Sequence, residues 1–463
     1  MKTHRFHPTV LREYDIRGIV GDTLSTADAL AIGWAYGSIL RNQGRSKVCA
    51  GYDGRISSPD LAAALRQGLT EAGVDVFDIG RGPTPMLYFA VHHLEADGGI
   101  MITGSHNPPD HNGFKMMLGT KPFFGEQIRE LGAIVGNGVE APGGGKVSRI
   151  SLDDIYVERL LAEVTPHLPE TGGLNVAWDP GNGAAGEIIQ KLVKHLPGRH
   201  VLINEEIDGT FPAHHPDPTD PKTLTQLRDV VREQQLDLGL AFDGDGDRLG
   251  AIDSRGRIVW GDQLLSILAR DVLAEQPGAT IIADVKASKV LFDEIAAMGG
   301  APLLWRTGHS LIKSKMAETG APLAGEMSGH IFFADRYYGF DDAIYAAIRL
   351  LGAVSRGGGS LAALYDSLPQ VINTPELRFP CPDERKFDIV AAVRASVTGK
   401  YDDVIDIDGV RVTSEHGWWL LRASNTQAVL VARCEARDEA GLNELKRQLA
   451  LELEALGLEA PEF

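Results

Sequence analysis

Residues 47–80 have the sequence KVCAGYDGRISSPDLAAALRQGLTEAGVDVFDIG. Two short apolar runs, KVCAGYD and VDVFDIG, flank an Ala/Leu-rich stretch with a helical pattern, PDLAAALRQGLTEAG. A third apolar run, GGIMIT, follows at residues 98–103. This alternation of strand-like and helical patterns predicts an α/β domain.

The same alternation returns twice further along the chain. A second block runs from GLNVAWDPGNG to LDLGLAFDGDGDRLGAID, and a third from GDQLLSILARDVLAEQ to LAGEMSGHIFF. The tail has the strand-like runs VIDIDGVRV, GWWLLRAS and QAVLVARCE and one helical pattern, LNELKRQLALELEAL. A length of 463 residues allows three or four domains at about 150 residues each. We therefore expect three α/β domains followed by a smaller α+β domain.

Glycine and proline mark the expected boundaries. VEAPGGGKVSRIS interrupts the pattern near residue 150, and a Gly/Pro-rich passage at about 356–384 predicts a linker. We expect domains at 1–150, 151–254, 255–367 and 368–463. The first three carry a polar, Gly-containing turn near a short apolar run, namely TGSHNPP, DGDGDR and GEMSGH, which indicates an internal repeat.

Composition excludes several classes of protein. A formal net charge of −18 argues against nucleic-acid binding, which needs a basic surface. The three cysteines have no CxxC spacing, so neither a disulfide framework nor a zinc site is expected. The first residues lack the apolar segment of a signal peptide, and no run of about 18 apolar residues occurs. We expect a cytoplasmic protein.

DGDGDR places Asp243, Asp245 and Asp247 at alternate positions after the apolar run LGLAF. On an extended chain these carboxylates would share one side and repel one another by roughly 4 kcal/mol per pair, so we expect them either to take up a proton or to hold a cation. Oxygen ligands favour Mg²⁺. A solvated acidic turn is the alternative. An EF-hand loop is excluded because Arg248 and Ser254 stand where Gly and Glu are required.

TGSHNPP raises the question of whether Ser105 is a nucleophile. Thr103 and Asn107 stand where the hydrolase motif GxSxG has its glycines, which argues against that class. Adjacent side chains on an extended chain point to opposite faces, so we do not expect His106 to be a base for Ser105. An ordinary Ser/Asn/Pro turn remains the alternative.

Several motifs occur in a fixed order along the whole chain: YDIRG, TGSHNPPDHNGFK, IDGTFPAHHPDP, FDGDGDR, DVKAS, RTGHSLIK, GEMSGH and RASNTQ. Together they closely resemble the α-D-phosphohexomutase family, in particular its phosphomannomutase/phosphoglucomutase branch. The resemblance implies four domains around a central cleft and the reversible conversion of hexose 1-phosphate and hexose 6-phosphate, for glucose and mannose, through a hexose 1,6-bisphosphate.

The resemblance also implies cofactors and metal ligands. Ser105 would be a phosphoserine, and Asp243, Asp245 and Asp247 would hold Mg²⁺ together with a phosphate oxygen on Ser105. Glucose 1,6-bisphosphate would act as intermediate and activator. A phosphoserine adds a charge of about −1.5 to −2 at pH 7, which three neighbouring carboxylates tolerate only with a cation between them.

Further site residues follow from the same resemblance. The reacting phosphate would be surrounded by Arg17, His106, Lys115 and Arg248, with Lys115 as a candidate general acid/base. To act near pH 7, this lysine would need a lowered pKa. The residues expected to bind the sugar or its phosphates are Tyr14, Arg17, Lys286, His309, Glu326, Ser328, His330, Arg422, Ser424, Asn425 and Thr426. His309 is also a candidate catalytic residue. In GEMSGH, an extended chain would turn Glu326, Ser328 and His330 one way.

Alternatives and secondary expectations complete this interpretation. A phosphoglucosamine mutase, a metal-dependent sugar-phosphate phosphatase and a non-catalytic sugar-phosphate-binding protein are the alternatives. We expect a monomer or weak dimer with a fourth domain hinged near residues 366–375. Gly104, where many relatives carry Ala, is expected only to loosen the serine turn.

Overall fold

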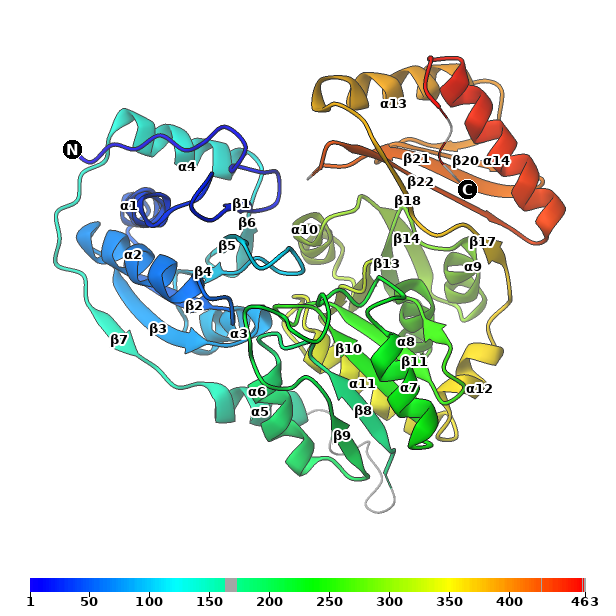
Figure 1. Cartoon of the computed structure of the whole chain (residues 1–463), viewed down its shortest axis with the longest axis horizontal. Coiled ribbons are helices and arrows are strands. Elements are labelled where there is room, and N and C mark those ends of the chain that lie inside the picture. The colour runs from blue at the N-terminus through cyan, green and yellow to red at the C-terminus, as the bar shows by residue number, and fades with distance from the viewer. Residues whose placement is uncertain (163–172, 426, 460, 462–463) are drawn as a thin grey trace.

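The computed structural model describes residues 1–463 except 163–172, 426, 460, 462 and 463. The described residues form four separate β-sheets that follow one another along the chain (Figure 1). No helix in this described part is both long and apolar enough to span a membrane. Thr426, one of the expected phosphate ligands, lies outside the described residues.

The first sheet has the strand order β1-β5-β4-β2-β3-β7, with β6 paired to β5. Its elements are β1 (Ile16–Ile19), α1 (Thr26–Asn42), β2 (Lys47–Tyr52), α2 (Ser58–Glu71), β3 (Asp75–Arg81), α3 (Thr84–His93), β4 (Gly98–Ile102), β5 (His111–Leu118), β6 (Lys121–Phe123), α4 (Glu126–Asn137) and β7 (Val147–Arg149). The segment 47–80 thus forms two parallel strands joined by a helix, as its apolar pattern predicts.

The second sheet has the order β12-β11-β10-β8-β9. Its elements are α5 (Asp153–Ala162), β8 (Val176–Asp179), α6 (Gly186–Leu192), the short 3₁₀ helix η2 (Val193–His195), β9 (His200–Leu202), α7 (Thr225–Glu233), β10 (Leu238–Phe242), β11 (Leu249–Asp253) and β12 (Ile258–Val259). Because β12 pairs with β11, this sheet extends past the expected boundary at residue 254.

The third sheet has the order β14-β13-β15-β16. Its elements are α8 (Gly261–Glu275), β13 (Thr280–Asp284), α9 (Lys289–Ala297), β14 (Ala301–Trp305), α10 (His309–Thr319), β15 (Leu323–Gly325), β16 (Ile331–Phe333), α11 (Ala343–Arg356) and α12 (Leu361–Asp366).

These three sheets repeat one strand pattern, which confirms the expected internal repeat. In each, two strands pair in parallel, a third adds in parallel, and a fourth returns antiparallel to the third. The polar turns TGSHNPP, DGDGDR and GEMSGH all connect the third strand of this pattern to the fourth. The repeat therefore brings the three motifs to the same place in each sheet.

The fourth sheet differs, since all its described pairings are antiparallel, in the order β17-β22-β21-β20-β19 with β18 beside β22. Its elements are β17 (Ile372–Asn373), β18 (Leu377–Pro380), α13 (Asp383–Val397), β19 (Asp403–Ile405), β20 (Val410–Ser414), β21 (Gly417–Ala423), β22 (Val429–Ala436) and α14 (Glu439–Glu454).

Two expectations about this part of the chain are wrong. Its described residues contain a second helix, α13, which follows Pro382 and packs Val393 and Val397 into the core. The passage at 356–384 is not one continuous linker, because it contains α12, β17 and β18. The segment without helix or strand between α12 and β17 is residues 367–371.

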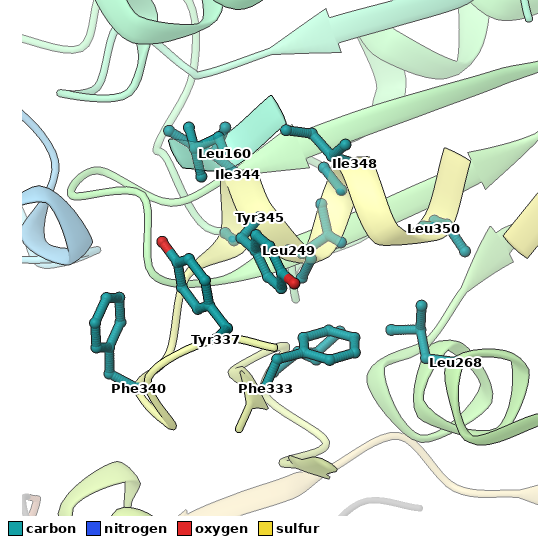
Figure 2. Packing of buried hydrophobic residues seen from close by; sticks show 14 of the residues in the cluster. Leu160, Leu249, Leu268, Phe333, Tyr337, Phe340, Ile344, Tyr345, Ile348 and Leu350 are labelled. Atoms are coloured by element: carbon teal, nitrogen blue, oxygen red, sulfur yellow. The ribbon is translucent and has the colours of Figure 1, made fainter. Parts of the chain in front are cut away.

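The buried side chains show how the four parts are joined. The largest hydrophobic cluster runs from the first sheet through the second into the third, for example from Tyr88 to Leu249 and Tyr345. Figure 2 shows part of this cluster, where Tyr337 stacks on Tyr345 with ring centroids 3.8 Å apart. The fourth domain has a cluster of its own, and a small separate cluster, Val285 with Trp418 and Leu420, joins it to the third.

Candidate active site

Ser105 lies in the turn between β4 and β5, and only 2% of its surface is exposed. Its φ of +49° is in the left-handed region, which non-glycine residues seldom adopt. The backbone amide of Ser105 donates to Thr103 Oγ1 at 2.9 Å, and Ser105 Oγ donates to Asp243 Oδ2 at 2.9 Å.

We expected the side chains of Ser105 and His106 to point to opposite faces, and this prediction is wrong. His106 Nδ1 lies 3.3 Å from Ser105 Oγ, because the left-handed backbone at Ser105 replaces the extended chain on which neighbours point apart. Burial lowers the pKa of His106 well below its usual value, and Arg248 and Arg17 lower it further. The imidazole is therefore held neutral beside the serine.

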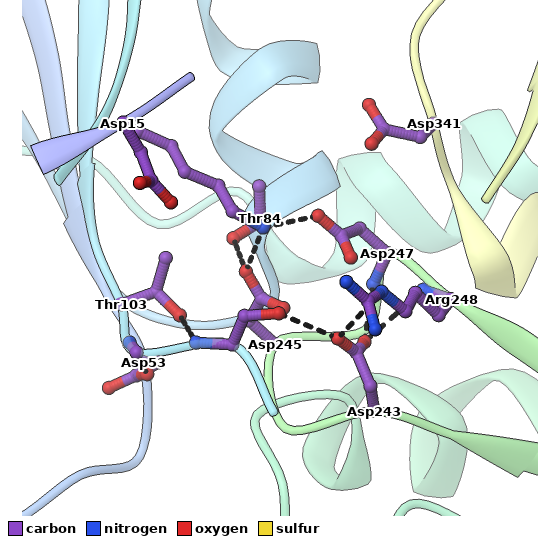
Figure 3. Close-up of polar contacts among 12 residues, drawn as sticks. Asp15, Asp53, Thr84, Thr103, Asp243, Asp245, Asp247, Arg248 and Asp341 are labelled. Carbon is purple, nitrogen blue, oxygen red and sulfur yellow. Dashed lines mark hydrogen bonds and ion pairs between the residues drawn. The ribbon is translucent and has the colours of Figure 1, made fainter. Parts of the chain in front are cut away.

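Asp243, Asp245 and Asp247 lie in the turn between β10 and β11, and all three are fully buried. Their side chains converge (Figure 3), with one oxygen from each within 4.8 Å of the others. The convergence comes from a turn with Gly246 at φ +74° rather than from an extended strand. The backbone amides of Asp247 and Arg248 donate to Asp243 Oδ1 at 3.1 and 3.2 Å.

These carboxylates suit a hard divalent cation. Among the described residues, the Oδ1 atoms of Asp245 and Asp247 are buried without a hydrogen-bond partner. Burial, followed by the charges of Asp245 and Asp247, raises the pKa of Asp243 well above its usual value. A buried carboxylate cluster with unpartnered oxygens is stabilised by a cation, and oxygen-only ligands are typical of Mg²⁺.

Lys115, on β5, contacts the Oδ2 atoms of two of these carboxylates. Its Nζ donates to Asp245 Oδ2 at 2.7 Å and also contacts Asp247 Oδ2. Burial lowers the pKa of Lys115, but Asp245 and Asp247 raise it by more, so the net pKa lies well above the usual lysine value. The lowered pKa that Lys115 would need as an acid/base near pH 7 is therefore absent in this arrangement, where Lys115 is a fixed cation.

Two buried residues, His330 and Asp341, lie beside Arg248, the last residue of the acidic loop. Arg248 Nε donates to His330 Nε2 at 3.0 Å, and His330 Nδ1 lies 3.0 Å from Asp341 Oδ2. His309, at the start of α10, stacks on His330 with ring centroids 5.6 Å apart. Asp341, visible in Figure 3, was missed in the sequence; its only signal is an acidic pair, DD, just before α11.

The motif GEMSGH has a different conformation from the expected one. Residues 326–329 form a turn, closed by the amide of Gly329 donating to the Glu326 carbonyl at 3.0 Å, with Gly329 at φ +92°. Alternation along an extended chain therefore does not place Glu326, Ser328 and His330. Glu326 is 3% exposed, accepts from the amide of Gly308, and has a pKa raised by burial.

Lys286 lies in the turn after β13, and its Nζ is 3.0 Å from Glu376 Oε2 and 3.6 Å from Asp284 Oδ2. Glu376 precedes β18 of the fourth domain, so this pair crosses between the third and fourth domains. Sequence reasoning missed Glu376, because no local pattern connects two residues 90 positions apart.

Tyr14 joins three parts of the molecule. Its hydroxyl donates to the Thr307 carbonyl at 2.9 Å and accepts from Asn425 Nδ2 at 2.6 Å. Burial raises its pKa to about 12, and Asp408 adds to this effect. Arg422, near Asn425, pairs with Asp408, whose Oδ2 lies 3.1 Å from the guanidinium.

Arg17 contacts the serine loop from β1, since its Nη1 donates to Asn107 Oδ1 at 2.9 Å. The expected residues thus form two connected groups. One contains Ser105 with the acidic loop, Arg17, His106, Lys115, Arg248, His309 and His330, and the other contains Tyr14, Glu326, Lys286, Arg422 and Asn425. Ser328 and Ser424 lie in the same motifs as members of the second group.

Family models match nearly the whole chain in four consecutive segments. The matches are to phosphoglucomutase/phosphomannomutase α/β/α domain I at residues 8–140, domain II at 154–256, domain III at 260–372 and the C-terminal domain at 376–452. This fold, with its buried serine and carboxylates, defines an intramolecular phosphotransferase, an isomerase of the phosphohexomutase class.

Relatives from bacteria place the chain more closely. It is 43% identical to a phosphomannomutase/phosphoglucomutase of Pseudomonas aeruginosa, covering 98% of this chain and 97% of the relative. A phosphoglucomutase of Neisseria gonorrhoeae is 42% identical, with 96% and 97% covered. A phosphoglucomutase/phosphomannomutase family protein of Burkholderia thailandensis superposes with a TM-score of 0.92 at 41% identity over 99% and 100%. The chain belongs to the phosphoglucomutase/phosphomannomutase family.

Proposed function

We propose that the protein interconverts hexose 1-phosphates and hexose 6-phosphates of glucose and mannose, with Ser105 as the phosphoryl carrier. The observation that carries the proposal is the 2.9 Å contact between Ser105 Oγ and Asp243 Oδ2 within the buried carboxylate cluster. Ser105 needs no catalytic triad in this role, because it enters the cycle already phosphorylated.

The acidic loop is proposed to hold Mg²⁺ through Asp243, Asp245 and Asp247. When bound, Mg²⁺ would offset the charge of the phosphoryl group during transfer. Lys115, Arg248 and Arg17 supply fixed positive charge from the protein around the same serine. Lys115 is buried and the two arginines are partly buried, so these cations need little reorganisation when charge develops on the phosphoryl oxygens.

The second group of residues would hold the rest of the sugar phosphate. Arg422 with Ser424, Asn425 and Thr426 would hold the phosphate that does not react, since a guanidinium with hydroxyl and amide donors suits phosphate. Glu326 and Ser328 would bind sugar hydroxyls, and Lys286 and His309 would bind the sugar or its phosphate. Tyr14 would join this group to the serine side.

In the proposed reaction, phosphorylated Ser105 gives its phosphoryl group to the free hydroxyl of a hexose phosphate. The hexose 1,6-bisphosphate then reorients, and its other phosphate returns to Ser105. In the first transfer the sugar hydroxyl loses a proton and Ser105 Oγ gains one. In the second transfer Ser105 loses its proton and the sugar oxygen gains one. Lys115 is the candidate for that exchange, and Asp245 and Asp247 hold it as a cation in the arrangement described.

The first test is substitution of the carrier. Ser105→Ala removes the oxygen that accepts the phosphoryl group, so we expect activity to fall by at least about 1,000-fold on both sugars. Mutase assays with glucose 1-phosphate and mannose 1-phosphate, each with added glucose 1,6-bisphosphate, measure this. Intact mass should show a phosphorylated form of the wild type and none of the variant. Wild-type activity of Ser105→Ala would contradict the proposal.

The same assay separates the alternatives. A phosphatase would release inorganic phosphate in step with substrate loss, and a binding protein would turn nothing over. A phosphoglucosamine mutase would prefer glucosamine phosphates to glucose and mannose phosphates. The protein as proposed converts isomers without net phosphate release.

A further inference from the structure

Arg55, between β2 and α2, has a fully buried side chain that reaches the serine loop. Its Nη2 donates to the carbonyls of Ser105 at 2.8 Å and Asn107 at 2.6 Å. Its Nη1 donates to the carbonyls of Pro108 at 2.5 Å and His111 at 3.0 Å. One guanidinium thus binds three carbonyl groups of the chain that connects β4 to β5 and the carbonyl of the first residue of β5.

Asp53 holds both the loop and the guanidinium (Figure 3 shows Asp53 near Thr103). Asp53 Oδ2 accepts from the amide of Gly104 at 3.1 Å and lies 3.2 Å from Arg55 Nε. Asp53 Oδ1 accepts from Ser58 Oγ at 2.6 Å, which fixes the carboxylate against α2. The loop is therefore anchored on both sides of Ser105.

Gly104 makes room for this arrangement. A Cβ atom at Gly104 would lie 2.4 Å from Cζ and Nε of Arg55, which is closer than any normal contact. The absence of a side chain at this position therefore does more than loosen the turn. It lets the guanidinium lie directly against the backbone beside Ser105.

The second domain covers the arginine. The ring of Phe211 lies 5.1 Å from Arg55 Cζ, and a Cβ at Gly209 would be 2.7 Å from Arg55 Cα. This cover keeps water from the guanidinium, so its hydrogen bonds to the loop carbonyls are not exchanged for hydrogen bonds to solvent. An arginine suits the position, because only its planar, multiply donating head can bind several carbonyls at once.

Ser105 needs such support, because its φ of +49° is unfavourable for a side chain with a Cβ and persists only where the surroundings enforce it. We propose that Arg55 is a positioning residue, whose guanidinium holds the loop carbonyls and thereby keeps Ser105 Oγ directed at the acidic loop. This role rests on the proposed function, in which Ser105 carries the phosphoryl group. Arg55 does not itself contact the reacting atoms.

The test compares Arg55→Lys with the control Arg349→Lys. Arg349 is also buried, pairs with Asp335 at 2.8 Å and lies 4.3 Å from the ring of Phe333, but it is remote from the serine loop. We measure, in a single turnover, transfer from glucose 1,6-bisphosphate to Ser105 by intact mass. We expect about 10- to 100-fold slower transfer in Arg55→Lys and the wild-type rate in Arg349→Lys.

Two further readouts separate positioning from general loss of structure. Binding of glucose 6-phosphate to the unphosphorylated protein should change by less than about 3-fold, because the residues proposed to bind the sugar are untouched. Hydrogen exchange of the amides at 103–111 should be faster in Arg55→Lys and unchanged in Arg349→Lys. Wild-type transfer and exchange in Arg55→Lys would overturn the inference.

A milder variant covers the case in which Arg55→Lys does not fold. Phe211→Leu keeps every hydrogen bond of the guanidinium but removes the ring that covers it, so we expect slower transfer and faster exchange at 103–111. Wild-type values for both in Phe211→Leu would then contradict the inference. A wild-type protein that never gains phosphate on Ser105 would contradict the proposed function instead, and hydrogen exchange alone would decide the role of Arg55.

Discussion

At the scale of single residues, Lys115 contacts one oxygen from each of two carboxylates in the acidic loop. Lys115 contacts the Oδ2 atoms of Asp245 and Asp247, while the Oδ1 atoms of both remain buried without a hydrogen-bond partner among the described residues. The lysine and a divalent cation can therefore bind the same two side chains together. Each compensates part of a charge that would otherwise be costly to bury.

This division predicts how Lys115→Met depends on metal. Removing a buried cation leaves unpaired carboxylates, so the free energy of unfolding should fall by about 3 kcal/mol in a chelator. Millimolar Mg²⁺ should restore more stability to the variant than it adds to the wild type, because it supplies the missing charge. Thermal unfolding with EDTA and with Mg²⁺ measures both.

The control for this prediction is Lys386→Met. Lys386 is a buried lysine of the fourth domain, whose Nζ donates to Asp383 Oδ1 at 2.6 Å and to the Gln427 carbonyl at 3.0 Å. We expect it to lose the same stability with and without Mg²⁺. Equal Mg²⁺ effects on Lys115→Met and Lys386→Met would contradict the shared-carboxylate arrangement.

Sequence patterns predicted which residue types meet but not the contacts they make. The carboxylates of DGDGDR converge as expected. Their convergence was predictable because all three belong to one short turn, whose pattern can be read from neighbouring residues. The approach of His106 to Ser105 depends on the positive φ of Ser105. This could not be predicted from the sequence, because positive φ is expected at glycine and position 105 is a serine. Asp341 and Glu376 were missed, because each meets its partner only through the packing of distant segments.

At the scale of elements, three topologically equivalent hairpin turns carry the serine, the acidic loop and GEMSGH. A short apolar strand followed by a polar turn was sufficient to predict each turn and the repeat. The directions of Glu326, Ser328 and His330 within GEMSGH were not predictable, because we inferred them from alternation along an extended chain, whereas residues 326–329 turn. Helix α13 was missed, since the charged start DERKFD concealed the apolar positions Val393 and Val397.

Asp342 links three elements and gives a pH dependence. Its Oδ1 accepts from the Tyr345 amide at 2.9 Å to cap α11, and its Oδ2 accepts from the hydroxyls of Tyr156 and Tyr337 at 2.7 Å. Burial raises the pKa of Asp342 to about 6. Since the unfolded value is about 3.9, the folded state binds the proton more tightly, and this stabilising contribution is lost as pH rises from about 4 through 6.

Asp342→Asn should remove that contribution. Relative to the wild type, the variant should gain stability as pH rises from 4.5 to 7.5, by at most about 3 kcal/mol. Urea unfolding across this range measures the difference. Asp438→Asn, which replaces the exposed cap of α14, is the control and should show no such trend. A constant difference between Asp342→Asn and wild type would show that Asp342 is ionised throughout.

At the scale of the whole molecule, one large cluster joins the first three domains, each of which also has a cluster of its own. The described apolar residues of the fourth domain form a separate cluster. The junction is a small apolar cluster together with buried arginines, of which Arg411 donates to the carbonyls of Val285 and Ala287 at 2.7 and 2.8 Å. Since β17 pairs with β22, residues 372–373 belong to the fourth domain, and the predicted hinge narrows to 367–371.

Four domains in this order were predictable, because each has its own run of strands and helices. The hydrophobic cluster that joins the first three domains was not predictable, because apolar residues of α3, α5 and α11 have the same sequence pattern whether they pack within a domain or between domains. The prediction that the fourth domain moves therefore gains a physical basis. A part of the chain with a separate core and a small junction can turn as a unit without exposing the main core.

Tyr14→Phe tests that motion. The hydroxyl of Tyr14 bonds the first domain to Asn425 of the fourth and to Thr307 of the third. Without it, the ligand-free protein should have a larger average radius of gyration in small-angle scattering, and saturating glucose 1,6-bisphosphate should restore the wild-type value. The KM for glucose 1-phosphate should rise about 5-fold, the effect of one hydrogen bond near 1 kcal/mol.

Tyr36→Phe is the matched control, because the Tyr36 hydroxyl donates to the Met117 carbonyl inside the first domain and holds no other domain. It should lower thermal stability and leave both the radius of gyration and the KM unchanged. If Tyr14→Phe and Tyr36→Phe scatter identically with and without the bisphosphate, the fourth domain does not turn about 367–371. Both orientations of the bisphosphate would then have to fit one rigid arrangement of the four domains.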